Sequence, residues 1–218
     1  MITHDFARHL GLDRGLTAIV GSGGKTTLMH RLAEELAPRG RVILTTSTHI
    51  RPSARYETLT DPTWETLSAA LDRGFPVCVG SPAGEGKLCA PQIPFARLTE
   101  LADYVLVEAD GSRGLPLKAH LPHEPVIPAA ARRTICVVGA AGLDRPIREA
   151  VHRPEVFCAL TGAGPEDPAS PAAVALALNR EALADVYYVN QCDDPGAAAR
   201  AEELLRLLSG CGLAGILL

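Results

Sequence analysis

The stretch Thr17-Ala18-Ile19-Val20-Gly21-Ser22-Gly23-Gly24-Lys25-Thr26-Thr27-Leu28-Met29 decides the fold. An apolar run, a glycine-rich turn and a helix-forming segment follow one another, which predicts a strand, a loop and a helix. Glycine adopts positive φ angles and has no Cβ, so the loop can bring several N–H groups close to one anion. Lys25 adds a positive charge for the outer phosphates of a nucleotide, and the Thr26 hydroxyl suits Mg²⁺. The predicted nucleotide contacts of this Walker A type of loop are Gly21, Ser22, Gly23, Gly24, Lys25, Thr26 and Thr27.

The loop is shorter than the usual Walker A pattern, whose first glycine lies five positions before the last one. Ile19 occupies that position here. ATP-dependent amide ligases of the cell-wall (Mur) type carry a similarly compact loop, and the sequence resembles theirs at this point. The alternative is a glycine-rich turn that binds nothing, but the strand, lysine, threonine and helix in register favour phosphate binding.

Composition sets the class of protein. The chain has 218 residues, of which 47% are hydrophobic, and this predicts a single nucleotide-binding domain over residues 1–218, with room for a small lobe within 111–183. A net charge of −4, no basic run and only 4% aromatic residues argue against nucleic acid as a partner. No apolar run approaches membrane-spanning length, and the N-terminus lacks the pattern of a signal peptide. We therefore expect a cytoplasmic protein without membrane contact.

Cysteine usage agrees with that expectation. The six cysteines are scattered and form no Cys-x-x-Cys pair. Such a pattern indicates reduced thiols rather than a disulfide framework.

The rest of the chain alternates between strands and helices. The pattern predicts helices at 2–12, 26–37, 62–73, 94–101, 151–162, 171–183 and 196–208. It predicts apolar strands at 41–46, at 76–80, within 102–111, at 133–139, within 186–195 and at 212–218. This order predicts an α/β fold, specifically a P-loop NTPase-like three-layer sandwich with a mostly parallel central sheet.

Polar residues follow two of these strands. Thr46, Thr48 and His49 come at the end of one, where ligands bind in open α/β sheets, and can face the γ-phosphate or Mg²⁺. The equally weighted alternative is strand-end threonines and an exposed histidine. Glu108 and Asp110 end the other strand, and their i, i+2 spacing predicts that both lie on one side. Paired with the loop, they are predicted to hold Mg²⁺ and to orient an attacking water, although solvated acids at a turn are the alternative.

The segment that follows is basic. Arg113 and Lys118 are candidates to neutralise phosphate charge or to bind an anionic substrate, with a solvated loop as the alternative for each. His123 joins them if the protein acts on an anionic acceptor. Pro122 breaks the helical spacing between His120 and His123, so we do not predict a metal site there.

A later strand ends in Asn190-Gln191-Cys192-Asp193. GTPases read guanine with Asn-Lys-x-Asp at such a position, and Gln191 replaces the lysine here. Asn190 and Asp193 are therefore candidates for contact with the base. The alternative is that Asp194-Pro195 caps the next helix and the residues before it only form a turn. The choice between ATP and GTP stays open.

Several of these segments together resemble the selenium-dependent molybdenum hydroxylase accessory proteins of the YqeC type. They are Val20–Met29, Thr45–Thr48, Val107–Ser112 with Pro116–Lys118, His123–Pro128, His152–Glu155 and Asn190–Asp193. The resemblance implies a P-loop nucleotide-binding protein that helps molybdenum hydroxylases of the xanthine dehydrogenase kind to mature. The expected partners are thus a nucleoside triphosphate and a molybdenum hydroxylase or its cofactor machinery, with a homodimer as one option.

Three functions compete. The first is a slow, regulated NTPase that acts as an accessory factor, with Lys25, Glu108, Asp110 and Arg113 in the catalytic roles and Mg²⁺ with ATP or GTP bound. The second is a small-molecule kinase or ATP-dependent ligase, which the compact loop suggests. The third is a non-catalytic module that uses the nucleotide as a switch.

Overall fold

The computed structural model describes residues 6–209 and 211–214, which form two compact units. Unit 1 comprises residues 6–19, 26–111 and 126–133, and unit 2 comprises 20–25, 112–125 and 134–209 with 211–214. The chain passes from one unit to the other inside two strands, β1 (Gly15–Gly21) and β9 (Ala131–Gly139). It also does so between Lys25 and Thr26, so the glycine-rich loop belongs to unit 2 and most of the following helix to unit 1.

Unit 1 contains a mostly parallel sheet in the order β1, β7 (Tyr104–Glu108), β2 (Val42–Thr46), β5 (Val77–Ala83), β6 (Lys87–Cys89) and β3 (His49–Ile50). The first four strands are parallel, and β4 (Glu57–Thr60) also pairs in parallel with β5. Only β6 pairs antiparallel, with β5 and with β3. Because parallel strands have both faces covered, they read as continuous apolar runs.

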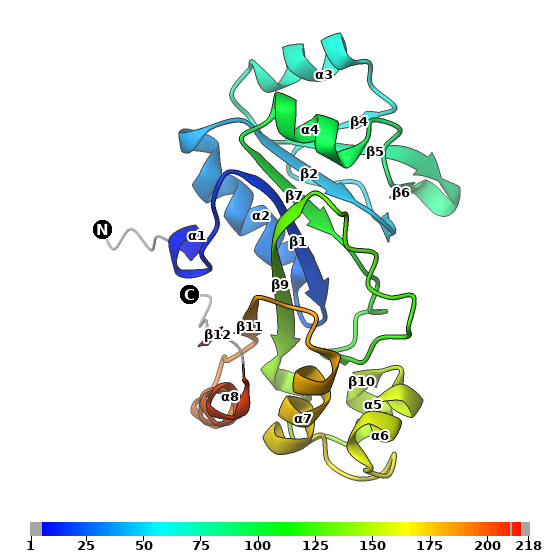
Figure 1. The fold of residues 1–218 in the computed structure, drawn as a ribbon, viewed down its shortest axis with the longest axis vertical. Helices are drawn as coiled ribbons and strands as arrows, with labels where there is room; N and C mark the ends of the chain where they lie inside the picture. The colour runs from blue at the N-terminus through cyan, green and yellow to red at the C-terminus, as the bar shows by residue number, and fades with distance from the viewer. Residues whose placement is uncertain (1–5, 210, 215–218) are drawn as a thin grey trace. The chain divides into compact units, whose positions relative to one another are not determined.

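The helices of unit 1 are α1 (Phe6–His9), α2 (Lys25–Leu36), α3 (Trp64–Leu71) and α4 (Phe95–Leu101), with the 3₁₀ turns η1 (Ala37–Arg39) and η2 (Gly84–Gly86). Every second residue of a strand, such as Val77 and Val79 in β5 or Val105 and Val107 in β7, belongs to one buried cluster. Leu67 of α3 and Leu98 of α4 belong to the same cluster. This period of two is what a strand needs to present one face to a pair of helices. Figure 1 shows α3 and α4 with β2, β5 and β7 in this part of the chain.

Unit 2 has a parallel three-stranded segment in the order β12 (Cys211–Ala214), β11 (Val186–Asn190) and β9. A second, two-stranded parallel pair joins β8 (Leu117–Lys118) to β10 (Val151–His152). The helices are α5 (Ile147–Ala150), α6 (Pro154–Thr161), α7 (Pro171–Glu181) and α8 (Pro195–Leu207), with the 3₁₀ turn η3 (Ala140–Gly142). Ser170 and Asp194 cap α7 and α8 by accepting hydrogen bonds from Ala173 N and Ala197 N.

The mixed α/β fold with a mostly parallel sheet confirms the predicted fold class. The expected helix at 151–162 begins only at Pro154, because Val151 and His152 pair with β8. Part of the expected helix at 2–12 and of the last strand at 212–218 lies outside the described residues. Sequence periodicity missed β3, β4, β6, β8, β10 and α5, each of which has at most four residues.

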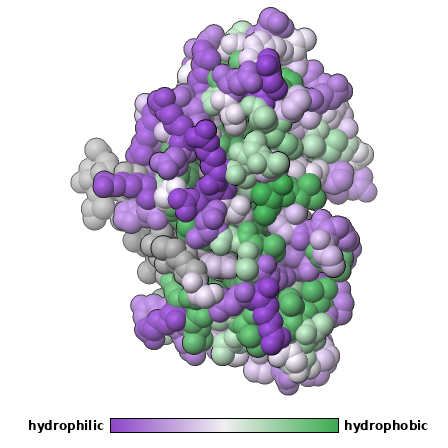
Figure 2. All heavy atoms as spheres, viewed as in Figure 1, coloured by the Kyte–Doolittle hydropathy of each residue, from purple (hydrophilic) through white to green (hydrophobic). Residues whose placement is uncertain are grey.

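The surface mixes hydrophilic and hydrophobic residues on the face drawn in Figure 2. Among the described residues, the large exposed hydrophobic side chains are Phe75, Val126, Leu176 and Leu207. They come from four separate places in the chain. None of the described helices combines the length and the apolar character that crossing a bilayer requires.

Candidate functional site

The glycine-rich loop has a backbone that only glycine accommodates well. Gly21, Gly23 and Gly24 have φ angles of 85°, 89° and 126°, in the left-handed region. A Cβ on Gly23 would lie 2.4 Å from the Cα of Gly139, and a Cβ on Gly24 would lie 2.3 Å from Nδ2 of Asn190. Both the conformation and the packing of the loop therefore require glycine at these positions.

Side chains and backbone groups of unit 2 hold the loop in place. Ser22 donates its N–H to the carbonyl of Val137 at 2.8 Å, and its hydroxyl donates to the carbonyl of Leu115. The Nδ2 atom of Asn190 donates to the carbonyl of Gly23 at 2.8 Å. Strand β9, the end of β11 and the carbonyl of Leu115 thus hold the loop.

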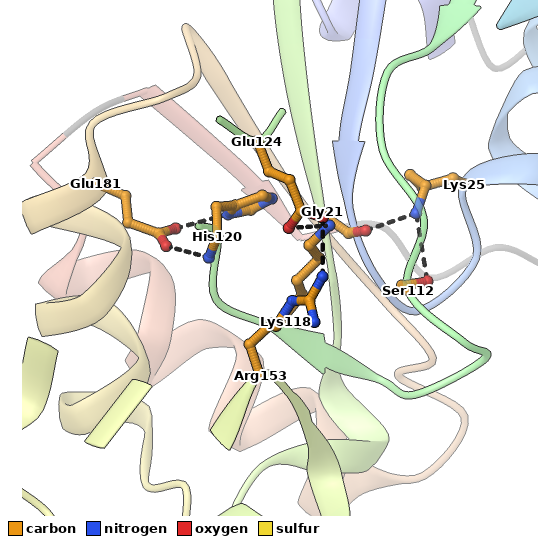
Figure 3. Close-up of polar contacts among 8 residues, drawn as sticks. All are labelled: Gly21, Lys25, Ser112, Lys118, His120, Glu124, Arg153 and Glu181. Carbon is orange, nitrogen blue, oxygen red and sulfur yellow. Dashed lines mark hydrogen bonds and ion pairs between the residues drawn. The ribbon is translucent and has the colours of Figure 1, made fainter. Parts of the chain in front are cut away.

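Lys25 holds its ammonium group against this loop. The residue is buried, with 4% of its surface exposed. Its Nζ donates to the carbonyl of Gly21 at 2.6 Å and to the hydroxyl of Ser112 at 3.3 Å, as Figure 3 shows. The carbonyl of Gly21 and the hydroxyl of Ser112 therefore hold the ammonium group of Lys25 at the loop.

Backbone donors gather at the same place. Within the described part of the chain, the N–H groups of Gly23 and Gly24 have no hydrogen-bond partner. The first N–H groups of α2 also lack partners inside the helix, as at any helix start, and carry the positive end of the helix dipole. Successive N–H groups in such a turn form a concave site for an anion. The loop of unit 2 can therefore bind an anionic group such as a phosphate.

Thr26 directly follows Lys25 in the chain and forms a hydrogen bond with Glu108 inside unit 1. Its Oγ1 donates to Oε2 of Glu108 at 3.2 Å, and both residues are at least partly exposed. A hydroxyl and a carboxylate are the hard oxygen ligands that Mg²⁺ prefers. The two side chains therefore fit a magnesium ion.

Asp110 has a different environment from Glu108. It is buried, with 1% of its surface exposed, whereas Glu108 is half-buried. Strand β7 ends at Glu108, and Ala109 N donates to the carbonyl of Ile19 at 2.9 Å. The regular alternation that predicted a common side for the two carboxylates thus ends before Asp110.

Thr46 links the ends of two strands in unit 1. Its hydroxyl donates to the carbonyl of Glu108 at 2.8 Å and accepts from Thr48 N at 3.0 Å. The residue is fully buried, Thr48 is half-buried and His49 is exposed. Thr46 therefore fixes the backbone at the position from which the Glu108 side chain leaves the sheet.

The other predicted residues divide by exposure. In unit 2, Lys118 and Asn190 are buried, whereas Arg113, His123 and Asp193 are exposed, as is Thr27 in unit 1. Asn190 uses its amide to hold the loop, as described above, and Tyr188 Oη donates to its Oδ1 at 3.4 Å. The contacts made by Asn190 are thus those of a residue that supports the loop.

Sequence reasoning missed several residues that support the loop or the segment around His120. Ser112 contacts Lys25, Gly139 leaves room for Gly23, and Glu181 binds His120 through its backbone N–H at 2.6 Å and its Nδ1 at 2.9 Å. Only Gly139 carries a signal, as a glycine at the end of an apolar strand. Ser112 and Glu181 act through tertiary contacts that no local pattern shows.

Two buried cysteines, Cys78 and Cys192, keep their protons at neutral pH. Burial raises the pKa of Cys78 and of Cys192 above the ordinary value. The thiolate is the reactive form of cysteine, so these thiols are weak nucleophiles and weak metal ligands at neutral pH.

Comparison of the sequence with known proteins identifies a family. The sequence model of a family described as YqeC protein matches residues 17–155. That range contains the loop, Glu108 and Lys118, and it ends before Asn190 and Asp193. A relative from Escherichia coli (strain K12), named "Uncharacterized protein YqeC", is 38% identical over 158 residues. The match includes 68% of this chain and 61% of the relative, so the chain spans less than two thirds of that protein's length.

Proposed function

Because the chain belongs to the YqeC family, we propose that it binds a nucleoside triphosphate together with Mg²⁺ and hydrolyses it slowly. The observation that carries the proposal is the loop of unit 2, in which unpartnered glycine N–H groups and a fixed lysine gather at the start of a helix. A triphosphate carries the negative charge that these N–H groups and the lysine ammonium attract.

The residues have separate roles in this proposal. The N–H groups of the loop and Lys25 bind the outer phosphates and offset the charge that develops on them. Thr26 and Glu108 hold Mg²⁺, which, when bound, neutralises the phosphate oxygens. Asp110 orients the attacking water and Arg113 adds positive charge. The water oxygen bonds to the γ-phosphorus, the bond to the β-phosphate oxygen breaks, and the nucleoside diphosphate and phosphate leave.

Calorimetry tests the binding step. ATP, GTP and CTP are titrated with Mg²⁺ into the unmodified protein, Lys25→Ala and Lys87→Ala. Lys87 is a matched control because it lies at the start of β6, outside the loop, where its Nζ pairs with Glu85 at 2.8 Å. We expect Lys25→Ala to abolish binding of every nucleotide and Lys87→Ala to leave it unchanged. Equal affinities in all three proteins would contradict the proposal.

In the cell, we propose a role in the maturation of selenium-dependent molybdenum hydroxylases. The support is the family resemblance of the glycine loop and of the segments 107–112 and 123–128. Such a factor should hydrolyse nucleotide slowly alone and faster with its client. The test measures phosphate release with and without a purified molybdenum hydroxylase that lacks its cofactor. A rate that depends only on a small acceptor molecule would favour another function.

That second function is a kinase or ligase for an anionic small molecule. The cluster of buried Lys118 with half-buried Glu124 and Arg153 favours it, because grouped basic side chains bind anionic acceptors. Diphosphate release that requires the acceptor, together with a phosphorylated or ligated product, would establish it.

A further inference from the structure

A second group of charged side chains lies in unit 2, near the glycine loop, since Lys118 and Gly21 line the same small cavity. Lys118 at the end of β8 places its Nζ 3.4 Å from Oε2 of Glu124, and Nη2 of Arg153 lies 3.1 Å from Oε1 of the same carboxylate. Figure 3 shows both cationic side chains pointing toward Glu124. One carboxylate is thus shared by two positive groups.

This group is largely shielded from water. The side chain of Lys118 is 0% exposed, and those of Glu124 and Arg153 are 20% and 29% exposed. Burying charges is costly unless their hydrogen bonds are satisfied. The Lys118–Glu124 distance of 3.4 Å is longer than the roughly 2.8 Å of a charge-assisted hydrogen bond, so this contact is an ion pair without a short hydrogen bond.

Two buried polar atoms in the group lack a hydrogen-bond partner among the described residues. They are Nε of Arg153, which is a donor, and Oε2 of Glu124, which is an acceptor and forms the ion pair with Lys118. Leaving such an atom unsatisfied costs about 1–3 kcal/mol, so native proteins rarely do so without a ligand or a water. A ligand that both accepts and donates hydrogen bonds would satisfy the two atoms.

The local field favours an anion. Burial lowers the pKa of His152, and the positive charges of Lys118, Arg153 and Arg113 lower it further, against an opposing effect of Glu124. Burial would raise the pKa of Glu124, but the hydrogen bond from Arg153 and the charge of Lys118 outweigh it and lower that pKa. Glu124 is therefore ionised at neutral pH and can only accept hydrogen bonds.

The three side chains are held in place before any ligand arrives. His152 pairs with Lys118 across β10 and β8, and its carbonyl accepts from Ala119 N at 3.0 Å. Arg153 has a φ of 70°, a strained conformation for a residue that is not glycine. Glu181 anchors the segment before Glu124 by binding both the N–H and the ring of His120, as Figure 3 shows. This preorganisation lowers the entropy cost of binding.

We propose that Lys118, Arg153 and Glu124 form a binding site for a small oxyanion that keeps a proton at neutral pH, with inorganic phosphate as the representative ligand. Lys118 and Arg153 donate to its oxygens, and the hydroxyl of the phosphate donates to Glu124. Sulfate has the same shape but no proton at neutral pH, so its oxygen would face the carboxylate without a hydrogen bond. The site therefore selects phosphate over sulfate. This proposal stands whether or not the glycine loop binds a nucleotide.

Calorimetric titration of the full chain with inorganic phosphate and with sulfate, at neutral pH and equal ionic strength, tests the proposal. We expect phosphate to bind at least about tenfold more tightly than sulfate, the ratio that one hydrogen bond to a charged group supplies. Arg153→Met and Lys118→Met should each weaken phosphate binding at least about tenfold. Arg148→Met is the matched control, because Arg148 is an exposed arginine paired with Glu166, and it should bind phosphate normally.

Glu124→Gln is the decisive variant, because the amide has the shape of the carboxylate and can donate to an oxyanion. It should weaken phosphate binding and strengthen sulfate binding, so that the preference disappears. It also keeps the test informative if Lys118→Met fails to fold, which thermal unfolding of each variant will show. Equal affinity for the two anions in the unmodified protein, or no binding of phosphate, would overturn the proposal.

Lys25→Ala separates this site from the nucleotide site. We expect it to lose nucleotide binding and to keep the phosphate preference. If phosphate binding is lost in Lys25→Ala but kept in Lys118→Met and Arg153→Met, the phosphate binds at the glycine loop and the proposed second site is wrong. Failure of nucleotide binding in the unmodified protein would not change the expected phosphate result.

Discussion

The side-chain amide of Asn190 donates a hydrogen bond of 2.8 Å to the carbonyl of Gly23, although the two residues are 167 positions apart in the chain. Asn190 is the last residue of β11, and its own Oδ1 accepts from Tyr188 at 3.4 Å. The end of a strand late in the chain therefore fixes the conformation of the glycine loop near its beginning.

This contact predicts how Asn190→Ala will affect nucleotide binding. Removing the amide leaves the buried carbonyl of Gly23 without a partner, which costs about 1–3 kcal/mol. Because the loop holds phosphates rather than the base, ATP and GTP affinities should fall together, by about tenfold or more. Calorimetry with both nucleotides measures the effect.

Asp193→Ala is the companion variant, since the exposed Asp193 is the remaining candidate for reading guanine. If Asp193 contacts the base, GTP affinity falls and ATP affinity does not. If Asp193→Ala leaves guanine affinity unchanged, the base-reading hypothesis is wrong. A loss confined to GTP in Asn190→Ala would show that Asn190 reads the base instead of supporting the loop.

Gly23→Ala should abolish nucleotide binding. The φ of 89° strains any other residue, and the new Cβ would lie 2.4 Å from the backbone of Gly139, so the loop must move. Gly74→Ala lies outside the loop and is the control for the effect on stability. Its φ is 79° but no atom lies within 4 Å of the added Cβ, so it bears the strain without the clash. Calorimetry should show normal binding for Gly74→Ala, and urea unfolding should show a larger loss of stability for Gly23→Ala.

The glycine loop could be predicted from sequence because its chemistry is local. Gly21–Lys25 are consecutive, and the left-handed conformations of the glycines are a property of the residue type. Long apolar strands such as β2, β7 and β11 were predicted for a similar reason, since a buried parallel strand reads as a continuous apolar run. Strands β8 and β10 have two residues each, which is too few to show the alternation of a strand in the sequence. Neither strand was therefore predicted.

The supporting contacts could not be predicted because they join distant parts of the chain. The pairing of Lys25 with Ser112 and of His120 with Glu181 depends on how loops fold back, not on sequence spacing. The burial of Lys118 could not be predicted from the sequence either. Its residue type indicated an anion site or a solvated loop, and only the structure shows that its side chain is buried against Glu124.

Glu108→Gln should change the dependence of nucleotide binding on Mg²⁺. The amide keeps a hydrogen-bonding group near the Thr26 hydroxyl but removes the charge that attracts the cation. Nucleotide affinity without Mg²⁺ should be unchanged, and the Mg²⁺ concentration needed for half of the maximal effect should rise about tenfold, as loss of one charge-assisted contact implies. Nucleotide titrations in EDTA measure the affinity without Mg²⁺, and titrations at increasing Mg²⁺ measure the half-maximal concentration.

Glu57→Gln is the control for that experiment, because Glu57 is an exposed carboxylate of unit 1 that pairs with Arg73. It should leave the Mg²⁺ dependence unchanged. An unaltered Mg²⁺ requirement in Glu108→Gln would remove Glu108 from the metal site and would favour Asp110.

The buried state of His152 predicts that stability falls in mild acid. Burial, followed by the charges of Lys118 and Arg153, lowers the pKa of His152 below 6.5. The unfolded chain therefore binds more protons than the folded protein as the pH falls through 6.5 toward the lower folded value. The free energy of unfolding should thus be full above pH 6.5, decrease between 6.5 and the lower folded pKa, and level off below that folded pKa. Urea unfolding at about pH 7.5 and about pH 5.5 measures the loss.

His152→Gln should reduce this loss, because glutamine does not titrate. Burial also lowers the pKa of His30 in unit 1, so His30 contributes to the same slope and the double variant should be flatter than either single one. The lowered pKa of Glu124 acts in a separate window, because that carboxylate takes up its proton only below 4.5. A pH dependence that is unchanged in His152→Gln would show that His152 is solvated in the folded protein, and the field inferred around Lys118 and Arg153 would then be weaker than the structure implies.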